Sequence, residues 1–368
     1  SNDAEPRPAS PAGVAAALDA VPDRAATVVV RNGFVVRADL DPAWEAKGLY
    51  VGPLVDGPDA EAALGAVAKH PIDVFAALND ACTVEPLLVS VPRGLTVDAP
   101  IVIADWVDQD GAAVFPRLVV RLGEDAEAKV VVWQGSEDVA AFVAPVVELD
   151  VARAARLAYG EVQDRTGRVW QITSQVGRAD ADTTLTGSHA GLGGEYARVR
   201  TDCRLVGRGA TGNLQAVYFG EQNQTLDFRT FQDHIAPDTT SNLIFKGVVG
   251  DQSRSVYTGR IKVEKEARGT NAFQTNRNIK LSEDAWAESV PNLEIENNDV
   301  HCSHASTVGP IDEEQRFYLE SRGVPTEIAE RLIVAGFFDE VLEQFPVLGV
   351  RPLIEAAIEA RLDRREQP

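Results

Sequence analysis

The feature that most constrains the fold of this chain is a repeat between residues 85 and 303. Short β-rich runs recur there, separated by Gly, Asp and Asn turns, with no amphipathic helix between them. An alanine lies in five of the turns: Ala126, Ala154, Ala181 and Ala210 are 28, 27 and 29 residues apart, and the step to Ala267 is 57. Such a repeat leaves a β-solenoid, a propeller or a sandwich. Small residues at the corners favour the solenoid, because successive corners stack, so we predict a parallel β-helix.

Two regions of different character flank this core. We divide the chain into a mixed α/β segment over residues 1–84, an all-β core over 85–308 and a helical module over 309–368. The module is predicted because helical periodicity returns after Gly309 and stops at Gly323 and again at Pro346.

The N-terminal segment carries local signals of its own. Residues 27–37 predict a hairpin that turns on Asn32-Gly33. Helical spacing is present over 60–70 and 71–82, with Pro71 at the expected start of the second helix.

The composition excludes several classes of function. A net charge of −21 without a basic stripe argues against nucleic acid as a partner. No apolar run approaches the roughly 20 residues needed to span a bilayer, so no membrane partner is expected. Three widely spaced cysteines cannot form a disulfide framework, and we expect a cytoplasmic, reduced protein with no secretion signal.

Most motifs that could carry chemistry have a simpler interpretation. The stretch GRGATG at 207–212 has the spacing of a dinucleotide fingerprint, but a strand follows it where a helix is required, so we interpret it as a repeat corner. The sequence contains neither a P-loop nor a GxSxG elbow. We expect His70 at the surface and His189 in a solvent-facing turn. A hydrogen bond to Asp233 could orient His234, but a structural role is favoured for this residue.

The two cysteines outside the cluster described next have a structural interpretation. Cys82 and Cys203 lie in apolar settings and are predicted to be small buried hydrophobic residues.

His301, Cys302 and His304 form the densest group of metal-ligating residue types in the chain. If the segment is extended, Cys302 and His304 share one face and His301 points to the other. A thiolate beside an imidazole suits zinc, iron or part of a cluster. Two ligands do not hold a metal alone, and the chain has no second Cys/His pair. A metal site, a buried structural pair and a site completed by another subunit therefore stay open.

Several motifs in the C-terminal half, in a consistent order, resemble the SufB/SufD family of scaffold proteins for iron–sulfur cluster assembly. They are TNAFQTNRNIKLS, SVPNLEIENNDVHCSHASTVGPIDEEQRFYLESRG and ERLIVAGFFDEVLEQFP. The run CSHASTVGPID resembles the SufD form, whereas SufB-like sequences carry a Glu-His-Glu-type run there. SufB-like sequences also have a cysteine after the Phe-Tyr pair, where this chain has Leu319, and an N-terminal cysteine cluster that is missing here.

The resemblance implies a right-handed parallel β-helix flanked by helices, and a non-enzymatic scaffold that pairs with SufB and docks the ATPase SufC. It places His304, with Cys302 as the weaker candidate, at the SufB interface, where iron or a nascent cluster is transient and no cofactor is held tightly by this chain alone. A homodimer is possible when SufB is absent. The C-terminal helices, with Phe337, Phe338 and Leu342 on their apolar faces, are predicted to bind SufC.

Two other functions are alternatives to the SufD-like scaffold. A β-solenoid carbohydrate-active enzyme would need clustered acidic and basic residues along one solenoid face, and the sequence shows no such constellation. A purely structural subunit of the same assembly system is the nearer alternative.

Overall fold

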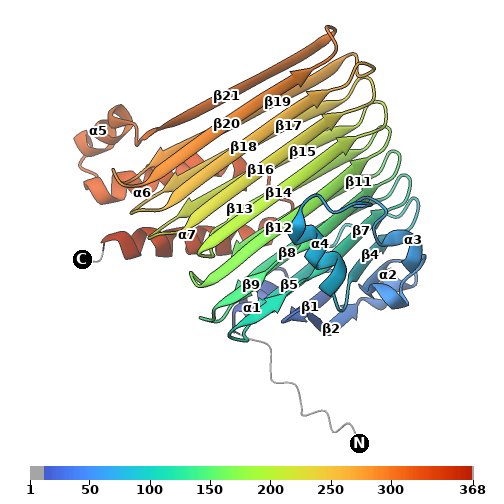
Figure 1. The fold of residues 1–368 in the computed structure, drawn as a ribbon. Helices are drawn as coiled ribbons and strands as arrows, with labels where there is room; N and C mark the ends of the chain where they lie inside the picture. The colour runs from blue at the N-terminus through green and yellow to red at the C-terminus, as the bar shows by residue number, and fades with distance from the viewer. Residues whose placement is uncertain (1–11, 367–368) are drawn as a thin grey trace, which may run out of the picture.

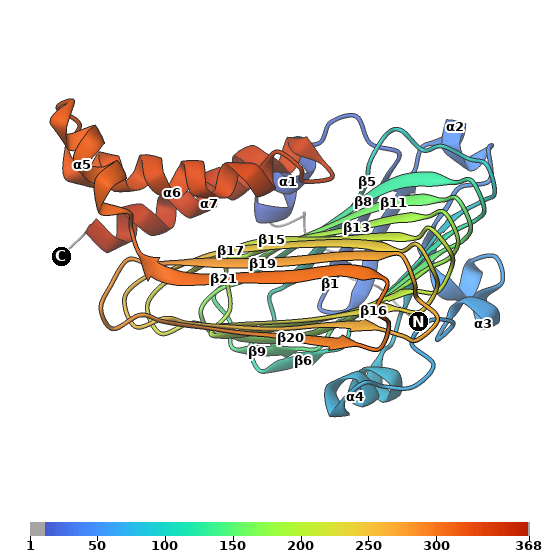
Figure 2. The same ribbon diagram turned by 90° about the horizontal axis from the view of Figure 1, so that it is seen from above.

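The structure, a computed structural model, describes residues 12–366, so residues 1–11 of the predicted N-terminal segment and 367–368 of the predicted helical module lie outside it. Two large sheets of parallel strands face each other, and the chain alternates between them turn after turn (Figures 1 and 2). The predicted parallel β-solenoid is therefore confirmed, and the propeller and sandwich are excluded.

Sheet A has ten strands and sheet B eleven. In spatial order, sheet A contains β2 (Phe34–Leu40), β1 (Ala26–Arg31), β5 (Ile101–Val107), β8 (Glu127–Ser136), β11 (Arg156–Asp164), β13 (Thr184–Gly191), β15 (Thr211–Gly220), β17 (Thr240–Val249), β19 (Thr270–Lys280) and β21 (Val300–Pro310). Sheet B contains β20 (Trp286–Ile295), β18 (Arg254–Val263), β16 (Thr225–His234), β14 (Tyr196–Leu205), β12 (Val169–Ala179), β10 (Val146–Val151), β7 (Arg117–Leu122), β4 (Leu87–Val91) and β3 (Tyr50–Pro53). Two short strands complete it: β9 (Ala141–Val143) pairs with β12, and β6 (Ala112–Val114) pairs with β9.

One corner of each turn stacks on the corner of the next. A residue with left-handed backbone occupies the same place in successive turns, and its N–H donates to the carbonyl of the following turn; these residues are Gly94, Asp125, Ala154, Asp182, Gly209, Asp238 and Gly269. The next residue is small and buried in most turns, as at Ala126, Ala155, Thr183, Ala210, Thr239 and Thr270. The predicted small corner residue thus exists, but Ala154, Ala181 and Ala267 do not occupy it. GRGATG is a repeat corner, as predicted.

The predicted hairpin is also confirmed, because β1 and β2 pair antiparallel and both Asn32 and Gly33 have positive φ, 51° and 86°. Strand β1 additionally pairs in parallel with β5, so the hairpin forms one end of sheet A. Antiparallel β3 closes sheet B at the same end. The first end of the solenoid is therefore capped by strands of reversed direction.

The helices cover opposite outer faces (Figure 2). Helix α1 (Ala12–Asp19) and the C-terminal helices α6 (Thr326–Leu342) and α7 (Arg351–Glu366) pack on sheet A, and α5 (Glu313–Ser321) lies beside α6. Helix α4 (Val74–Cys82) packs on sheet B, where Phe75 contacts Phe142 with ring centroids 6.0 Å apart. The short helices are α2 (Pro42–Glu45) and α3 (Ala60–Ala63) and the 3₁₀ turns Leu54–Asp56 and Leu348–Val350. Among the described residues, no helix has the length and apolar character to cross a bilayer.

Candidate functional site at the open end of the solenoid

The segment His301–His304 lies in β21, the last strand of sheet A. Along the described chain, β21 pairs in parallel with β19 and has no strand on its other side. Strand β20 is likewise the outermost strand of sheet B. Figure 1 shows both strands at the end of the solenoid opposite the N-terminal cap. Within the described residues, the outer edges of β20 and β21 therefore have no strand partner, which makes this end a template for another strand.

The register fixes which side chains of β21 face the interior. Cys302 pairs with Ala272 and packs against the buried group around Ile261 and Val263. Since side chains alternate along a strand, His304 points to the same side as Cys302, and His301 points to the outer face. The predicted shared face of Cys302 and His304 is present, with His304 exposed and Cys302 partly buried.

The two side chains do not make a complete metal site by themselves. Burial raises the pKa of the Cys302 thiol, so this sulfur keeps its proton at neutral pH until a metal displaces it. The described part of the chain contains no group of three His, Cys, Asp or Glu side chains that could hold a metal ion. Iron bound here would need further ligands, and the free edge of β21 is where a partner chain could bring them.

The other histidines and cysteines are not part of this end. His70 is at the surface, as predicted, and Cys203 is buried, with burial raising its thiol pKa to about 12. Cys82 is exposed on α4, so the prediction of a buried residue is wrong; only one side of that helix packs on sheet B.

Of the remaining two histidine predictions, the structural role of His234 is confirmed and the exposed turn at His189 is wrong. His234 is buried in a structural role, but its partners are the hydroxyls of Thr239 and Ser241 at 2.8 and 2.9 Å, and not Asp233. His189 is not in a solvent-facing turn: it lies in β13, between β11 and β15, and its side chain is only 12% exposed.

Sequence reasoning missed a cluster of ionisable groups inside the solenoid. Glu161 of β11 is 1% exposed, and its Oε2 accepts a hydrogen bond from Tyr159 at 3.1 Å. Its Oε1 has no hydrogen-bond partner within residues 12–366. The Nδ1 atom of His189 is 3.7 Å from Oε1. Burial raises the pKa of Glu161 to about 7 and lowers that of His189 to about 3. The signal was present, because Glu161 and Gln163 follow Leu157 and Tyr159 at alternate positions, on the face of β11 that the two apolar residues predict to be buried.

The C-terminal helices hold the residues predicted to bind a partner. Phe338 and Leu342 are buried between α6 and its neighbours, whereas Phe337 is partly exposed. Beneath α6, Lys246 of β17 bonds the carbonyl of Phe337 at 2.7 Å and Glu340 at 2.6 Å. These contacts hold α6 on sheet A.

A groove of about 890 Å³ lies where α5 and α6 meet β19 and β21. Tyr318, Leu332 and Phe337 line its apolar part, and Arg277 lines its polar part. The groove is continuous with the open end, because Thr307 and Gly309 of β21 also line it.

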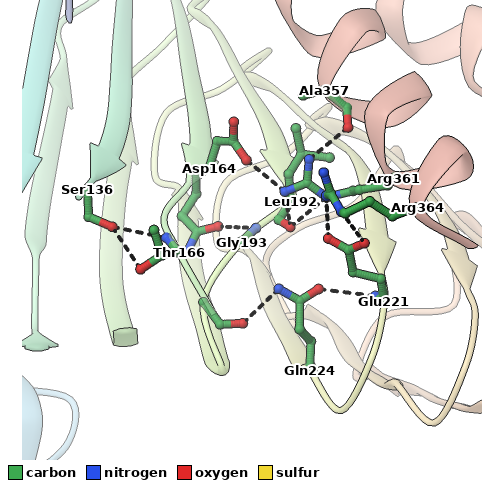
Figure 3. A network of polar contacts seen from close by, with 12 residues as sticks. Ser136, Asp164, Thr166, Leu192, Gly193, Glu221, Gln224, Ala357, Arg361 and Arg364 are labelled. Carbon is green, nitrogen blue, oxygen red and sulfur yellow. Dashed lines mark hydrogen bonds and ion pairs between the residues drawn. The ribbon is translucent and has the colours of Figure 1, made fainter. Parts of the chain in front are cut away.

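Two arginines of helix α7 bind it to the solenoid through hydrogen bonds and ion pairs (Figure 3). Arg361, 6% exposed, donates to the carbonyl of Leu192 and to Asp164 at 2.7 Å. Arg364 donates twice to Glu221, at 3.0 and 2.5 Å. The bonded groups belong to successive turns, so α7 ties them together and fixes the position of the helices.

Comparison with known proteins identifies the family to which these features belong. The family described as the SufBD core domain of SUF-system FeS cluster assembly matches residues 106–337, from β5 into α6. An iron–sulfur cluster assembly SufBD family protein of Mycobacterium tuberculosis is 37% identical over 287 residues, 76% of this chain and 72% of that protein. Protein ABCI7, chloroplastic, of Arabidopsis thaliana is 27% identical over 340 residues, 88% and 71% of the two chains. The iron–sulfur cluster assembly protein SufD of Bacillus subtilis is 28% identical over 280 residues, 74% and 63%.

Proposed function

Because this chain belongs to the SufBD family of iron–sulfur cluster assembly proteins, we propose that it is the SufD-like subunit of a cytoplasmic scaffold that also contains SufB and the ATPase SufC. The observation that carries the proposal is the open end of the solenoid, where His304 lies on an edge strand whose outer side has no strand partner among the described residues. An assembly scaffold of this family replaces the carbohydrate-active enzyme considered from the repeat alone.

The open end supports pairing with a second family member. A related solenoid would present the same kind of strand edge, and edge-to-edge pairing would satisfy the free N–H and C=O groups of β20 and β21. Apolar side chains beside these edges are exposed by between 39% and 45%: Phe273, Trp286, Val290, Ile295 and Val308. In the absence of SufB the same edge could accept a second copy of this chain.

His304 is the residue proposed to act on iron or on the nascent cluster at that interface. An imidazole is a good iron ligand and is neutral over much of the physiological range, so binding a metal costs it little. Cys302 lies on the same face two residues earlier, and its partly buried thiol is the weaker candidate.

The α5–α6 surface supports docking of SufC. Phe317, Tyr318 and Leu332 are 70%, 57% and 52% exposed, which is unusual for apolar side chains of this size and indicates a binding surface. Phe337 extends this surface into the groove. Phe338 and Leu342 would contribute indirectly, since they hold α6 in place.

The test of the cluster role compares two histidines of the same strand. The complex with SufB and SufC is reconstituted anaerobically with His304→Ala or His301→Ala, and iron and acid-labile sulfide are measured per complex. We expect cluster yield to fall in His304→Ala and to persist in His301→Ala, whose side chain faces outward. Full yield from His304→Ala in a correctly assembled complex would contradict the role of His304.

Docking is tested with two exposed leucines. Leu332→Glu changes the α6 surface, and Leu348→Glu, 60% exposed in the turn before α7, is the matched control. We expect SufC to be retained by Leu348→Glu and lost from Leu332→Glu. Equal retention by both variants would refute the assignment of this surface.

A further inference from the structure

A glutamine beside His304 has no bonding partner. Gln274 lies on β19 directly opposite His304 in the parallel register and faces the interior with Ala272, Asn276 and Asn278. The residue is 2% exposed, and among the described residues neither its Nε2 nor its Oε1 has a hydrogen-bond partner. A buried amide that leaves both of its polar groups unsatisfied costs free energy and requires an explanation.

The neighbouring residues do not require an unsatisfied polar side chain at position 274. On the same face of β19, Asn276 donates to the Tyr218 hydroxyl at 3.0 Å and Asn278 donates to Asn276 at 2.9 Å. The equivalent positions one and two turns earlier hold Leu243 and Leu214. The solenoid therefore accepts leucine in this row, whereas the last two turns hold the polar side chains of Gln274 and His304.

The opposite wall leaves room for the amide. Gly259 of β18 faces Gln274, and a Cβ at this glycine would lie 2.3 Å from Nε2. Any larger residue at position 259 would displace the amide. On β20, Ser289 also has a buried hydroxyl without a partner. The interior at the open end thus presents polar atoms that the described chain does not satisfy.

We propose that Gln274 is a second residue of the iron site at His304, an inference that rests on the proposed function. The carboxamide oxygen of Gln274 is a neutral oxygen ligand and the imidazole of His304 a neutral nitrogen ligand, a pair that suits a ferrous ion whose remaining ligands come from the partner chain or from solvent. The bond to the metal would give the buried amide the partner that it lacks, which explains why this position does not hold leucine.

The test uses the full-length chain with Co²⁺, followed by absorption, and with Fe²⁺ under anaerobic conditions. We expect weak binding that falls by about ten-fold or more in Gln274→Leu and in His304→Ala, and that is restored or strengthened in Gln274→Glu, which keeps an oxygen ligand. The matched control is Gln232→Leu, because Gln232 is also buried but donates to the Gly212 carbonyl at 3.3 Å, away from the open end. That variant should bind Co²⁺ as the unaltered chain does.

Thermal unfolding separates a site residue from a structural one. Gln274→Leu should fold with unchanged or higher stability, since it restores the leucine of the neighbouring turns, whereas Gln232→Leu loses a hydrogen bond and should be less stable. If His304→Ala binds Co²⁺ normally and also supports full cluster yield, the proposed function fails together with this inference. If His304→Ala loses binding while Gln274→Leu keeps it, only the role of Gln274 is refuted. An unaltered chain that binds no Co²⁺ would also overturn the inference.

Discussion

Replacing the buried Glu161 by glutamine should stabilise the protein, and by an amount that depends on pH. The carboxyl group faces Tyr159 on its own strand, Asp105 on β5, Gln134 on β8, His189 on β13, and Arg165, which follows β11. Despite these neighbours, burial dominates and raises its pKa from 4.5 to about 7. The native protein therefore keeps a proton that the unfolded chain has already released.

The raised pKa of Glu161 sets the sign and the size of the change in the free energy of unfolding. Between pH 4.5 and 7 the native state binds more protons than the unfolded state, so the free energy of unfolding falls as pH rises through this window and is constant above it. At about 1.4 kcal/mol per pKa unit, the ionised carboxylate costs up to about 3 kcal/mol at pH 8. Glutamine has nearly the same shape and no charge. We expect Glu161→Gln to gain up to about 3 kcal/mol at pH 8 and less than about 1 kcal/mol at pH 5.

The assay is urea unfolding of both proteins, followed by circular dichroism at pH 5, 6, 7 and 8. His189 titrates in an overlapping range, since its lowered pKa of about 3 removes stability as pH falls below 6.5, so the difference between the two proteins isolates Glu161. Glu148→Gln is the matched control. Glu148 is fully buried but accepts from three backbone N–H groups and from Arg117, so its loss should destabilise at every pH, by about 2 kcal/mol or more. A gain from Glu161→Gln that did not change with pH, or a loss at pH 8, would refute the reasoning.

Three further outcomes are expected. Arg361→Ala should give faster amide exchange in α7 and lower the free energy of unfolding by about 2–4 kcal/mol, because it removes the buried bonds to Leu192 and Asp164. Arg364→Ala, at a side chain 47% exposed, should lower it by less than about 1 kcal/mol, and similar amide exchange in both variants would contradict the role of Arg361. Tyr218→Phe removes a hydroxyl that bonds two asparagines and should lower the free energy of unfolding by about 1–2 kcal/mol, a claim that an unchanged urea midpoint would disprove. Ala154→Gly should raise the free energy of unfolding by about 0.5–1 kcal/mol, because Ala154 has a left-handed backbone with φ of 58°. Ala126→Gly, at the buried corner, should lower it, and a change of the same sign in both variants would contradict the strain assigned to Ala154.

The sequence by itself determined the parts of this protein that depend on local rules. The repeat of strands and turns predicted a parallel solenoid because each turn must bury its inner face against the next. Asn32-Gly33 determined the hairpin, since both residues adopt positive φ readily. Strand alternation placed Cys302 and His304 on one face, because the side-chain period of a strand is two whatever lies around it. The family motifs led to the same fold and to iron–sulfur cluster assembly.

The tertiary structure decided what depends on neighbours from other turns. Gly-rich residues around His189 were interpreted as a turn, yet two flanking strands hold them extended, and Gly187 and Gly191 leave space for Leu214 and Phe228. Local spacing could not show that Cys82 lies on the solvent side of α4, because burial depends on which face meets sheet B.

The main features of the candidate site likewise depend on the tertiary structure. A strand repeat does not reveal which turn is last, so the open edge of β21 and the exposure of His304 emerged only when the sheets were complete. Gln274 is 30 residues from His304 in sequence and lies beside it because of the register between β19 and β21. Its unsatisfied amide is a property of the whole interior, since a hydrogen-bond partner is absent only once every neighbouring turn has been placed.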